Sequence, residues 1–153
     1  MRSKTANWFI CKISYKKMME DGLRKKVTET YVVNAASFTE AEARIIEEMS
    51  AYISGEFEVA EIDRAVFKEI FFMEQVADTR WYKSKLQFIT IDEKTEKEKR
   101  TNVYYLVEGC SLESARRNID EVMDGTMIDY SITSVSETPI MDVFEYKVKS
   151  TDY

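Results

Sequence analysis

The feature that most constrains the fold of this chain is a pattern that occurs twice. Residues 31–49 and 105–123 are identical at seven of nineteen positions when aligned at an offset of 74, where chance gives about one identity. The identical positions in the first copy are Tyr31, Val33, Ser37, Ala41, Ile45, Glu47 and Met49, and in the second copy Tyr105, Val107, Ser111, Ala115, Ile119, Glu121 and Met123. The sequence therefore predicts an internal tandem duplication.

Hydrophobic periodicity predicts the same order of elements in each copy. In the first, alternation from Trp8 indicates a strand, Asp21-Gly22 a hairpin turn and residues 25–35 the returning strand. Ser37 and Glu40 form a capping box that starts a helix, which Gly55 ends. Strands are then predicted at 57–62 and 66–72. The second copy repeats this plan, with strands at 81–88, 101–107, 130–135 and 142–144, a charged hairpin at 92–100, and a helix between Ser111 and Gly125.

This pattern predicts an α+β fold built from two β-β-α-β-β units with one helix per copy and a pseudo-two-fold relation. The predicted organisation is a flexible lead at 1–7, a first repeat at 8–73, a linker at 74–80, a second repeat at 81–147 and a tail at 148–153. One copy alone is marginally small, so we expect the repeats to pack as one globular unit. Either they share one antiparallel sheet, which we favour, or their open sheet faces pack together.

Composition excludes several classes of function. The chain has no His, so Ser-His and Cys-His catalysis is excluded. Its two Cys residues have no C-x-x-C spacing, and its four Gly residues are isolated, so neither a zinc site nor a phosphate-binding loop is indicated. No apolar stretch is long enough for a membrane span or for the core of a signal peptide. We expect a cytoplasmic, non-enzymatic protein without a cofactor and without a membrane contact.

Charge is distributed unevenly along the chain. The net charge is -6, yet the first 30 residues hold eight Lys or Arg against three acidic residues. A candidate ligand or nucleic-acid contact lies on the first hairpin and, in the second copy, on the corresponding strand: Lys12, Lys16, Lys17, Arg24, Lys25 and Lys26 with Trp8, and Trp81, Lys83 and Lys85. The alternative is that these Lys residues protect an edge strand and that both Trp residues belong to the core.

Two acidic residues occupy equivalent places in the copies. Glu69 and Asp142 each lie two residues before a Phe of the last predicted strand. Two such carboxylates can bind a divalent cation or act as an acid and a base, but they are more often structural partners of a Lys or a backbone N–H. The sequence offers no third ligand, so no metal site is predicted.

Several short strings carry a resemblance to a known family. They are Trp8-Phe9, Cys11-Lys12, Asp21-Gly22, Lys25-Lys26-Val27, Ser37-Phe38-Thr39-Glu40-Ala41-Glu42-Ala43-Arg44, Gly55-Glu56-Phe57, Trp81-Tyr82-Lys83 and Asp142-Val143-Phe144. Over about Trp8 to Tyr146 the chain resembles a small domain family of unknown function that is associated with gut Bacteroidetes and their phages. The resemblance implies a bacterial or phage protein, encoded in some cases on a mobile element, and it transfers no catalytic residue and no ligand.

Three functional hypotheses follow from the sequence. The first is a non-enzymatic binding module that contacts a protein or small-ligand partner through its sheet or through the junction between the copies. The alternative is a nucleic-acid-binding protein of phage or bacterial DNA metabolism that uses the basic first hairpin. An enzyme that uses carboxylates and a metal is the least favoured, and the sequence sets no oligomeric state.

Overall fold

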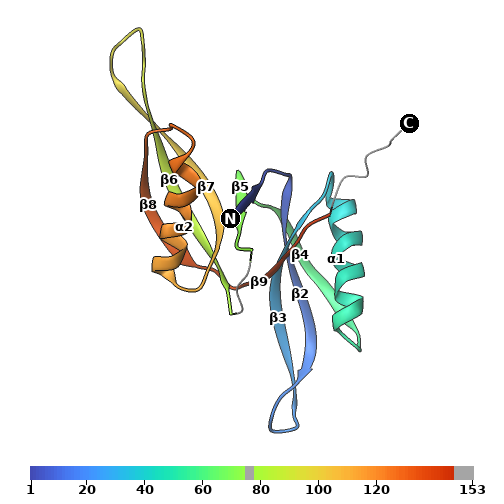
Figure 1. Cartoon of the computed structure of the whole chain (residues 1–153). Helices are drawn as coiled ribbons and strands as arrows, with labels where there is room; N and C mark the ends of the chain where they lie inside the picture. The colour runs from blue at the N-terminus through green and yellow to red at the C-terminus, as the bar shows by residue number, and fades with distance from the viewer. Residues whose placement is uncertain (75–77, 147–153) are drawn as a thin grey trace, which may run out of the picture. The chain divides into compact units, whose positions relative to one another are not determined.

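The computed structural model describes residues 1–74 and 78–146, and these residues form the strands and two helices shown in Figure 1. The predicted tail at 148–153 and residues 75–77 of the predicted linker lie outside the described residues. In chain order the elements are β1 (Arg2–Lys4), β2 (Trp8–Met18), β3 (Arg24–Asn34), α1 (Phe38–Tyr52), β4 (Phe57–Arg64), β5 (Glu69–Phe72), β6 (Arg80–Ile91), β7 (Glu98–Gly109), α2 (Leu112–Asp124), β8 (Tyr130–Glu137) and β9 (Ile140–Phe144). The α+β class and the single helix in each half are confirmed.

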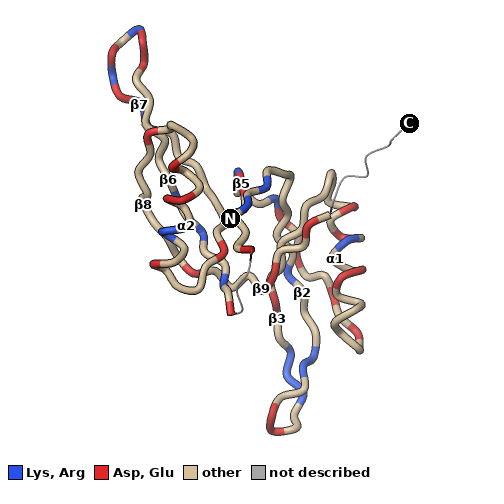
Figure 2. Tube along the Cα trace, viewed as in Figure 1, with Lys and Arg blue, Asp and Glu red and all other residues tan. Residues whose placement is uncertain are grey.

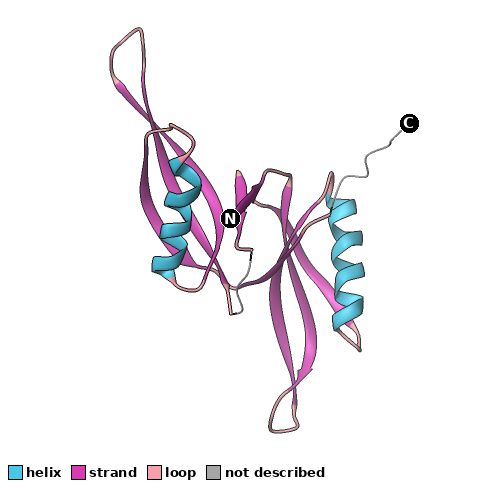
Figure 3. Ribbon diagram, in the orientation of Figure 1, coloured by secondary structure: helices cyan, strands magenta, loops and turns pink. Residues whose placement is uncertain are grey.

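The chain divides into two compact units, each built from two separate segments. Unit 1 contains residues 1–6 and 66–139, and unit 2 contains residues 7–65 together with the chain from Ile140 onward. In each unit one helix packs against one face of a mixed sheet (Figure 3). The bounds of the units therefore differ from those of the two sequence repeats.

Unit 2 is a four-stranded sheet in the order β4-β2-β3-β9, covered by α1. The alternation of β2 places Phe9, Cys11 and Ile13 on the helix side, where they are fully buried against a helical stripe. That stripe consists of Ala41, Ile45 and Met49. The Ser37 side chain caps α1 by accepting a hydrogen bond from the Glu40 N–H at 3.1 Å.

Unit 1 is a five-stranded sheet in the order β1-β5-β7-β6-β8, covered by α2. Its core contains Tyr82 and Leu86 of β6 and Val107 of β7, packed against the α2 stripe of Ala115, Ile119 and Met123. Ser111 caps α2 by accepting from the Ser114 N–H at 3.1 Å. The predicted flexible lead differs from the structure, because Arg2–Lys4 form β1 and pair with β5.

The expectation of one shared antiparallel sheet is wrong, because the chain forms two mixed sheets. After β4 the chain leaves unit 2 and places β5 beside β7 in parallel, and after β8 it leaves unit 1 and places β9 beside β3 in parallel. The physical reason lies in the connections. Residues 65–68 contain no Gly, Asn or Asp for a tight hairpin turn, so β5 does not fold back on β4.

Pairing inside the two units follows the same register. Tyr31 of β3 lies opposite Asp142 in unit 2, and Tyr105 of β7 lies opposite Glu69 in unit 1. A bulge interrupts the pairing with the outer strand at Lys12/Ile13 in unit 2 and at Lys85/Leu86 in unit 1. Residues at matching sequence positions therefore occupy matching places in the two sheets.

Candidate functional site

The most distinctive surface in unit 2 is the end of the β2–β3 hairpin. β4 begins opposite Tyr15, and β9 begins opposite Thr30. Beyond these positions β2 and β3 pair only with each other and extend past the rest of their sheet (Figure 1). We call residues Lys16–Lys26 the basic arm. Its turn contains Gly22 at a φ of 83°, a conformation that favours glycine.

The strand register of the basic arm places lysines directly opposite lysines. Lys16 pairs with Lys26, and the next pair is Lys17 with Lys25. Because successive pairs point to opposite faces of a ribbon, positive charge lies on both faces. Like charges directly opposite each other destabilise a strand pair. None of the ion pairs among residues 1–74 and 78–146 includes one of these four lysines or Arg24.

The corresponding hairpin of unit 1 is also an extended strand pair, but its charge pattern is different. We call residues Ile89–Arg100 the second arm; it contains four Lys or Arg and four acidic residues, whereas the basic arm contains five and two. Its facing pairs include Thr90 with Lys99, and the Arg100 guanidinium lies 3.4 Å from the Glu98 carboxylate. Figure 2 shows basic residues gathered along the basic arm and mixed charges along the second arm. A hairpin at this place in the fold therefore does not need the excess of positive charge that the basic arm carries.

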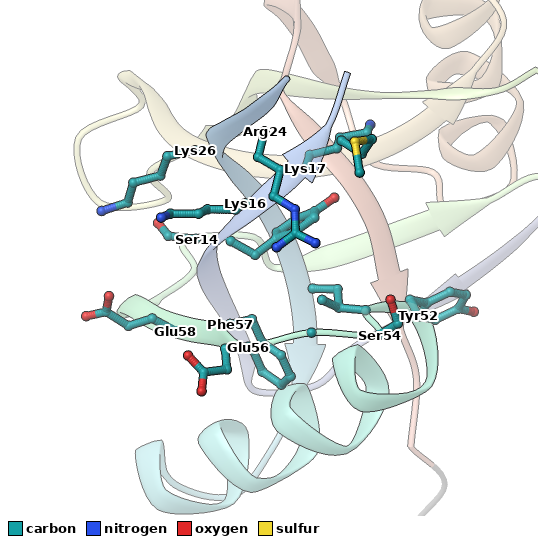
Figure 4. A pocket seen from close by; sticks show the side chains of 14 residues that line it. Ser14, Lys16, Lys17, Arg24, Lys26, Tyr52, Ser54, Glu56, Phe57 and Glu58 are labelled. Carbon is teal, nitrogen blue, oxygen red and sulfur yellow. The ribbon is translucent and has the colours of Figure 1, made fainter. Parts of the chain in front are cut away.

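A groove of about 800 Å³ runs between the basic arm and the segment that joins α1 to β4. Figure 4 shows Arg24 directed into the space between the arm and the start of β4. The arm side is basic, the inner part is aromatic and the far side carries two carboxylates: the lining residues used below are Lys16, Arg24 and Lys26, then Tyr15, Tyr52 and Phe57, then Glu56 and Glu58. A groove with three such zones is chemically asymmetric.

The groove is open because, within the described residues, the loop after α1 does not hydrogen-bond to the arm. In unit 1 the Ile89 N–H donates to the Asp129 carbonyl at 2.8 Å, so the loop after α2 continues the pairing along β6. The matching positions in unit 2 are Lys16 and Glu56, and the described backbone includes no such bond between them. The edge of β2 beyond Tyr15 is therefore left exposed to the groove.

Glu29 fixes the inner aromatic part of the groove. A hydrogen bond to Glu29, together with burial, raises the pKa of Tyr15 to about 12. The Tyr31 hydroxyl also donates to the Glu29 carboxylate, at 3.4 Å. Glu29 thus lies near both tyrosines, and the pKa of Tyr15 lies far above neutral pH.

The structure separates the candidate contact residues that the sequence predicts. It brings Lys16, Lys17, Arg24, Lys25 and Lys26 together in the basic arm. Lys12 also lies on β2, but its ammonium forms an ion pair with Glu61 at 3.1 Å, and the hydrogen bond from Lys12 lowers the pKa of Glu61.

The other predicted contacts do not join the arm. Trp8 and Trp81 are only 2% and 4% exposed, so their rings offer no stacking face. Lys83 and Lys85 lie on β6 of unit 1, with the Lys83 ammonium 5.1 Å from the Tyr104 ring centroid. The sequence did not lead us to predict Tyr52 and Glu56 as residues of the site. The feature that could have indicated them is the short α1–β4 connection around Gly55.

The two acidic residues at equivalent sequence positions lie in different units. Glu69 lies beside Tyr105 in unit 1, and Asp142 lies beside Tyr31 in unit 2. No group of three or more Cys, Asp and Glu residues within 1–74 and 78–146 is placed to hold a metal ion. In the same part of the chain, neither helix has the length and apolar character needed to cross a membrane.

Comparison with known proteins yields one match. A family model described as a domain of unknown function (DUF4494) matches residues 7–146. This match confirms the resemblance to a family of unknown function; the association with gut Bacteroidetes and phages stays a prediction. No curated protein matches the chain, and no solved structure matches it.

Proposed function

The chain belongs to the DUF4494 family of domains of unknown function, and from its own geometry we propose that it is a non-enzymatic nucleic-acid-binding protein that contacts phosphates through the basic arm. The expectation of a binding module is kept. Nucleic acid is favoured over an unspecified protein or small-ligand partner because the basic arm presents five cationic side chains. Within residues 1–74 and 78–146, none of these five side chains forms an ion pair with a carboxylate.

The observation that carries the proposal is the register that places Lys16 opposite Lys26 and Lys17 opposite Lys25. Each facing pair costs stability in the free protein. A bound phosphate backbone removes this cost, because it supplies anions along both strands of the ribbon and releases its own counterions. The arrangement is therefore unfavourable alone and favourable in the presence of a polyanion.

The two units also differ in charge where the proposed contact lies. We infer that the halves arose by tandem duplication, which the matching registers at Tyr31 and Tyr105 and the matching bulges at Lys12 and Lys85 support. Under this inference the two arms began alike. The second arm is now neutral overall and the basic arm is strongly basic. The positive charge of the basic arm was therefore gained or retained for a reason other than maintaining the fold.

A titration of the full chain tests the proposal. Labelled DNA of about 20 nucleotides, single-stranded and duplex, is titrated by fluorescence anisotropy at about 50 and 200 mM salt. We expect binding at low salt, and for single strands a slope of log K against log salt of about -3 to -4 if five phosphates are contacted. No binding of either DNA at low salt would refute the proposal.

A matched pair of double variants assigns the binding to the arm. Lys16→Glu with Lys25→Glu converts both facing Lys pairs into opposite-charge pairs, which protects the ribbon while reversing its charge. Lys97→Glu with Lys99→Glu makes the same change of charge in the second arm. We expect affinity to fall at least about tenfold for the first variant and less than about twofold for the second. Equal losses in both would show that only net charge matters.

A further inference from the structure

We propose that the groove beside the basic arm binds single-stranded nucleic acid, with a base stacked on Tyr52 and the adjoining phosphate held by Arg24. This inference rests on the proposed function and names the form of nucleic acid that the same region accepts. The groove volume of about 800 Å³ lies within the range of about 300–1,000 Å³ that is typical of ligand pockets. A nucleotide can therefore enter it.

Of the rings that line the groove, Tyr52 is also the outer member of a stack of three aromatic side chains. Tyr31 stacks on Phe144 with 5.6 Å between centroids, and Phe144 stacks on Tyr52 at 6.4 Å, with interplanar angles of 18° and 24°. Tyr52 is the outermost ring and is 71% exposed. A nucleobase can continue this stack on Tyr52, as bases do on exposed aromatic side chains of single-strand-binding proteins.

The cationic side of the groove is placed for the phosphate of the same nucleotide. Arg24 points into the groove, whereas Lys16 and Lys26 of the same arm extend away from Tyr52 (Figure 4) and can contact neighbouring phosphates of the strand. Tyr52 is the last residue of α1, and the carbonyl end of a helix carries partial negative charge. The base rather than the phosphate is therefore favoured on the Tyr52 side.

The far side of the groove favours a single strand over a duplex. Glu56 and Glu58 line it, and each is exposed. Carboxylates accept hydrogen bonds from the exocyclic amino groups of bases, which are free in a single strand. The second backbone of a duplex would instead bring phosphates toward these carboxylates. The groove therefore offers a cation for a phosphate, an exposed ring for a base face and carboxylates for base edges of a single strand.

The test uses the full chain, a labelled oligothymidylate, a labelled oligocytidylate and a duplex of equal length. We expect both single strands to bind more tightly than the duplex. A single strand that carries a photoreactive thymine analogue should cross-link to the peptide that contains Tyr52. Tyr52→Ala should weaken single-strand binding about tenfold and leave duplex binding within about twofold, since stacking is lost and phosphate contacts remain.

A second pair of variants guards against loss of folding, because Tyr52 contacts Phe144. Ser54→Trp fills the groove from an exposed position, and Met127→Trp adds the same side chain at the matching, 98% exposed position in unit 1. Only Ser54→Trp should weaken single-strand binding. If both Tyr52→Ala and Ser54→Trp bind like the unchanged chain while reversal of the basic arm abolishes binding, the groove proposal is overturned and the proposed function stands. If the unchanged chain binds no nucleic acid, both are overturned.

Discussion

Lys16 of β2 lies directly opposite Lys26 of β3, with both side chains exposed on the same face of a two-stranded ribbon. The variant Lys26→Glu converts this facing pair into one of opposite charge. We expect the free energy of unfolding to rise by about 0.2–1 kcal/mol, while affinity for nucleic acid falls because a phosphate contact is lost. Urea denaturation and anisotropy titration measure the two effects.

The control for this variant lies in the second arm. Lys99 faces Thr90, so Lys99→Glu removes no facing repulsion. We expect that variant to change neither stability nor affinity appreciably. A Lys26→Glu variant that lost both stability and affinity would show that Lys26 supports the fold, which would remove the main argument for the arm as a binding surface.

Local structure was predictable because each element depends on nearby residues. The alternation Phe9, Cys11, Ile13 indicated a strand with one buried face, and Ser37 and Ser111 marked the helix starts; both serines accept the expected capping hydrogen bond. Sequence identity at an offset of 74 likewise anticipated the matching registers at Tyr31 and Tyr105. The duplication itself remains an inference.

The exchange of β5 and β9 between the sheets was not predictable from periodicity. Val143 and Ile70 fit any neighbour that offers an apolar pairing edge, so their patterns predict strands without saying which sheet they join. The candidate site was predictable only in part. Lys16 and Lys26 were identified from charge, but their facing register depends on the β2–β3 pairing, and the position of Tyr52 across the groove depends on where α1 ends.

Ser84 provides a prediction about stability in unit 1. Its side chain is fully buried, and within the described residues its hydroxyl has no hydrogen-bond partner. Leaving a buried hydroxyl unpaired costs about 1–3 kcal/mol. We expect Ser84→Ala to raise the free energy of unfolding by about 1 kcal/mol, measured by urea denaturation, and the exposed control Ser136→Ala to leave it unchanged. A large loss of stability would mean that the hydroxyl is hydrogen-bonded in solution.

The two thiols should differ sharply in reactivity. Cys11 is buried, and burial raises the pKa of its thiol to about 12, whereas Cys110 is exposed. Because the thiolate is the reactive form, a thiol reagent at pH 8 should label one site per folded chain and two in urea. The raised pKa also means that stability declines as pH rises from about 9 toward 12, since only the unfolded chain ionises readily there. The variant Cys110→Ser should abolish labelling of the folded chain; persistent labelling would show that Cys11 is accessible.

The exchanged strands predict that a mutation in one half of the sequence destabilises the unit built mainly from the other half. Phe71 of β5 is fully buried in unit 1 and stacks on Tyr105 at 4.7 Å, so Phe71→Ala should cost about 3–5 kcal/mol. Phe144 of β9 is half-buried in unit 2 and stacks on Tyr31 at 5.6 Å, so Phe144→Ala should cost about 2 kcal/mol.

Hydrogen exchange of backbone amides distinguishes the two units. Phe71→Ala should accelerate exchange mainly in β6 and β7, although Phe71 belongs to the first half of the chain, and Phe144→Ala mainly in β2 and β3. Met141→Ala, at a 56% exposed position of β9, serves as the control and should change little. If Phe71→Ala instead loosened β2 and β3 first, β5 would pair within its own half in solution and the exchange of strands would be wrong. Because each unit contains a strand from the other half, we expect neither repeat to be stable when it is expressed alone.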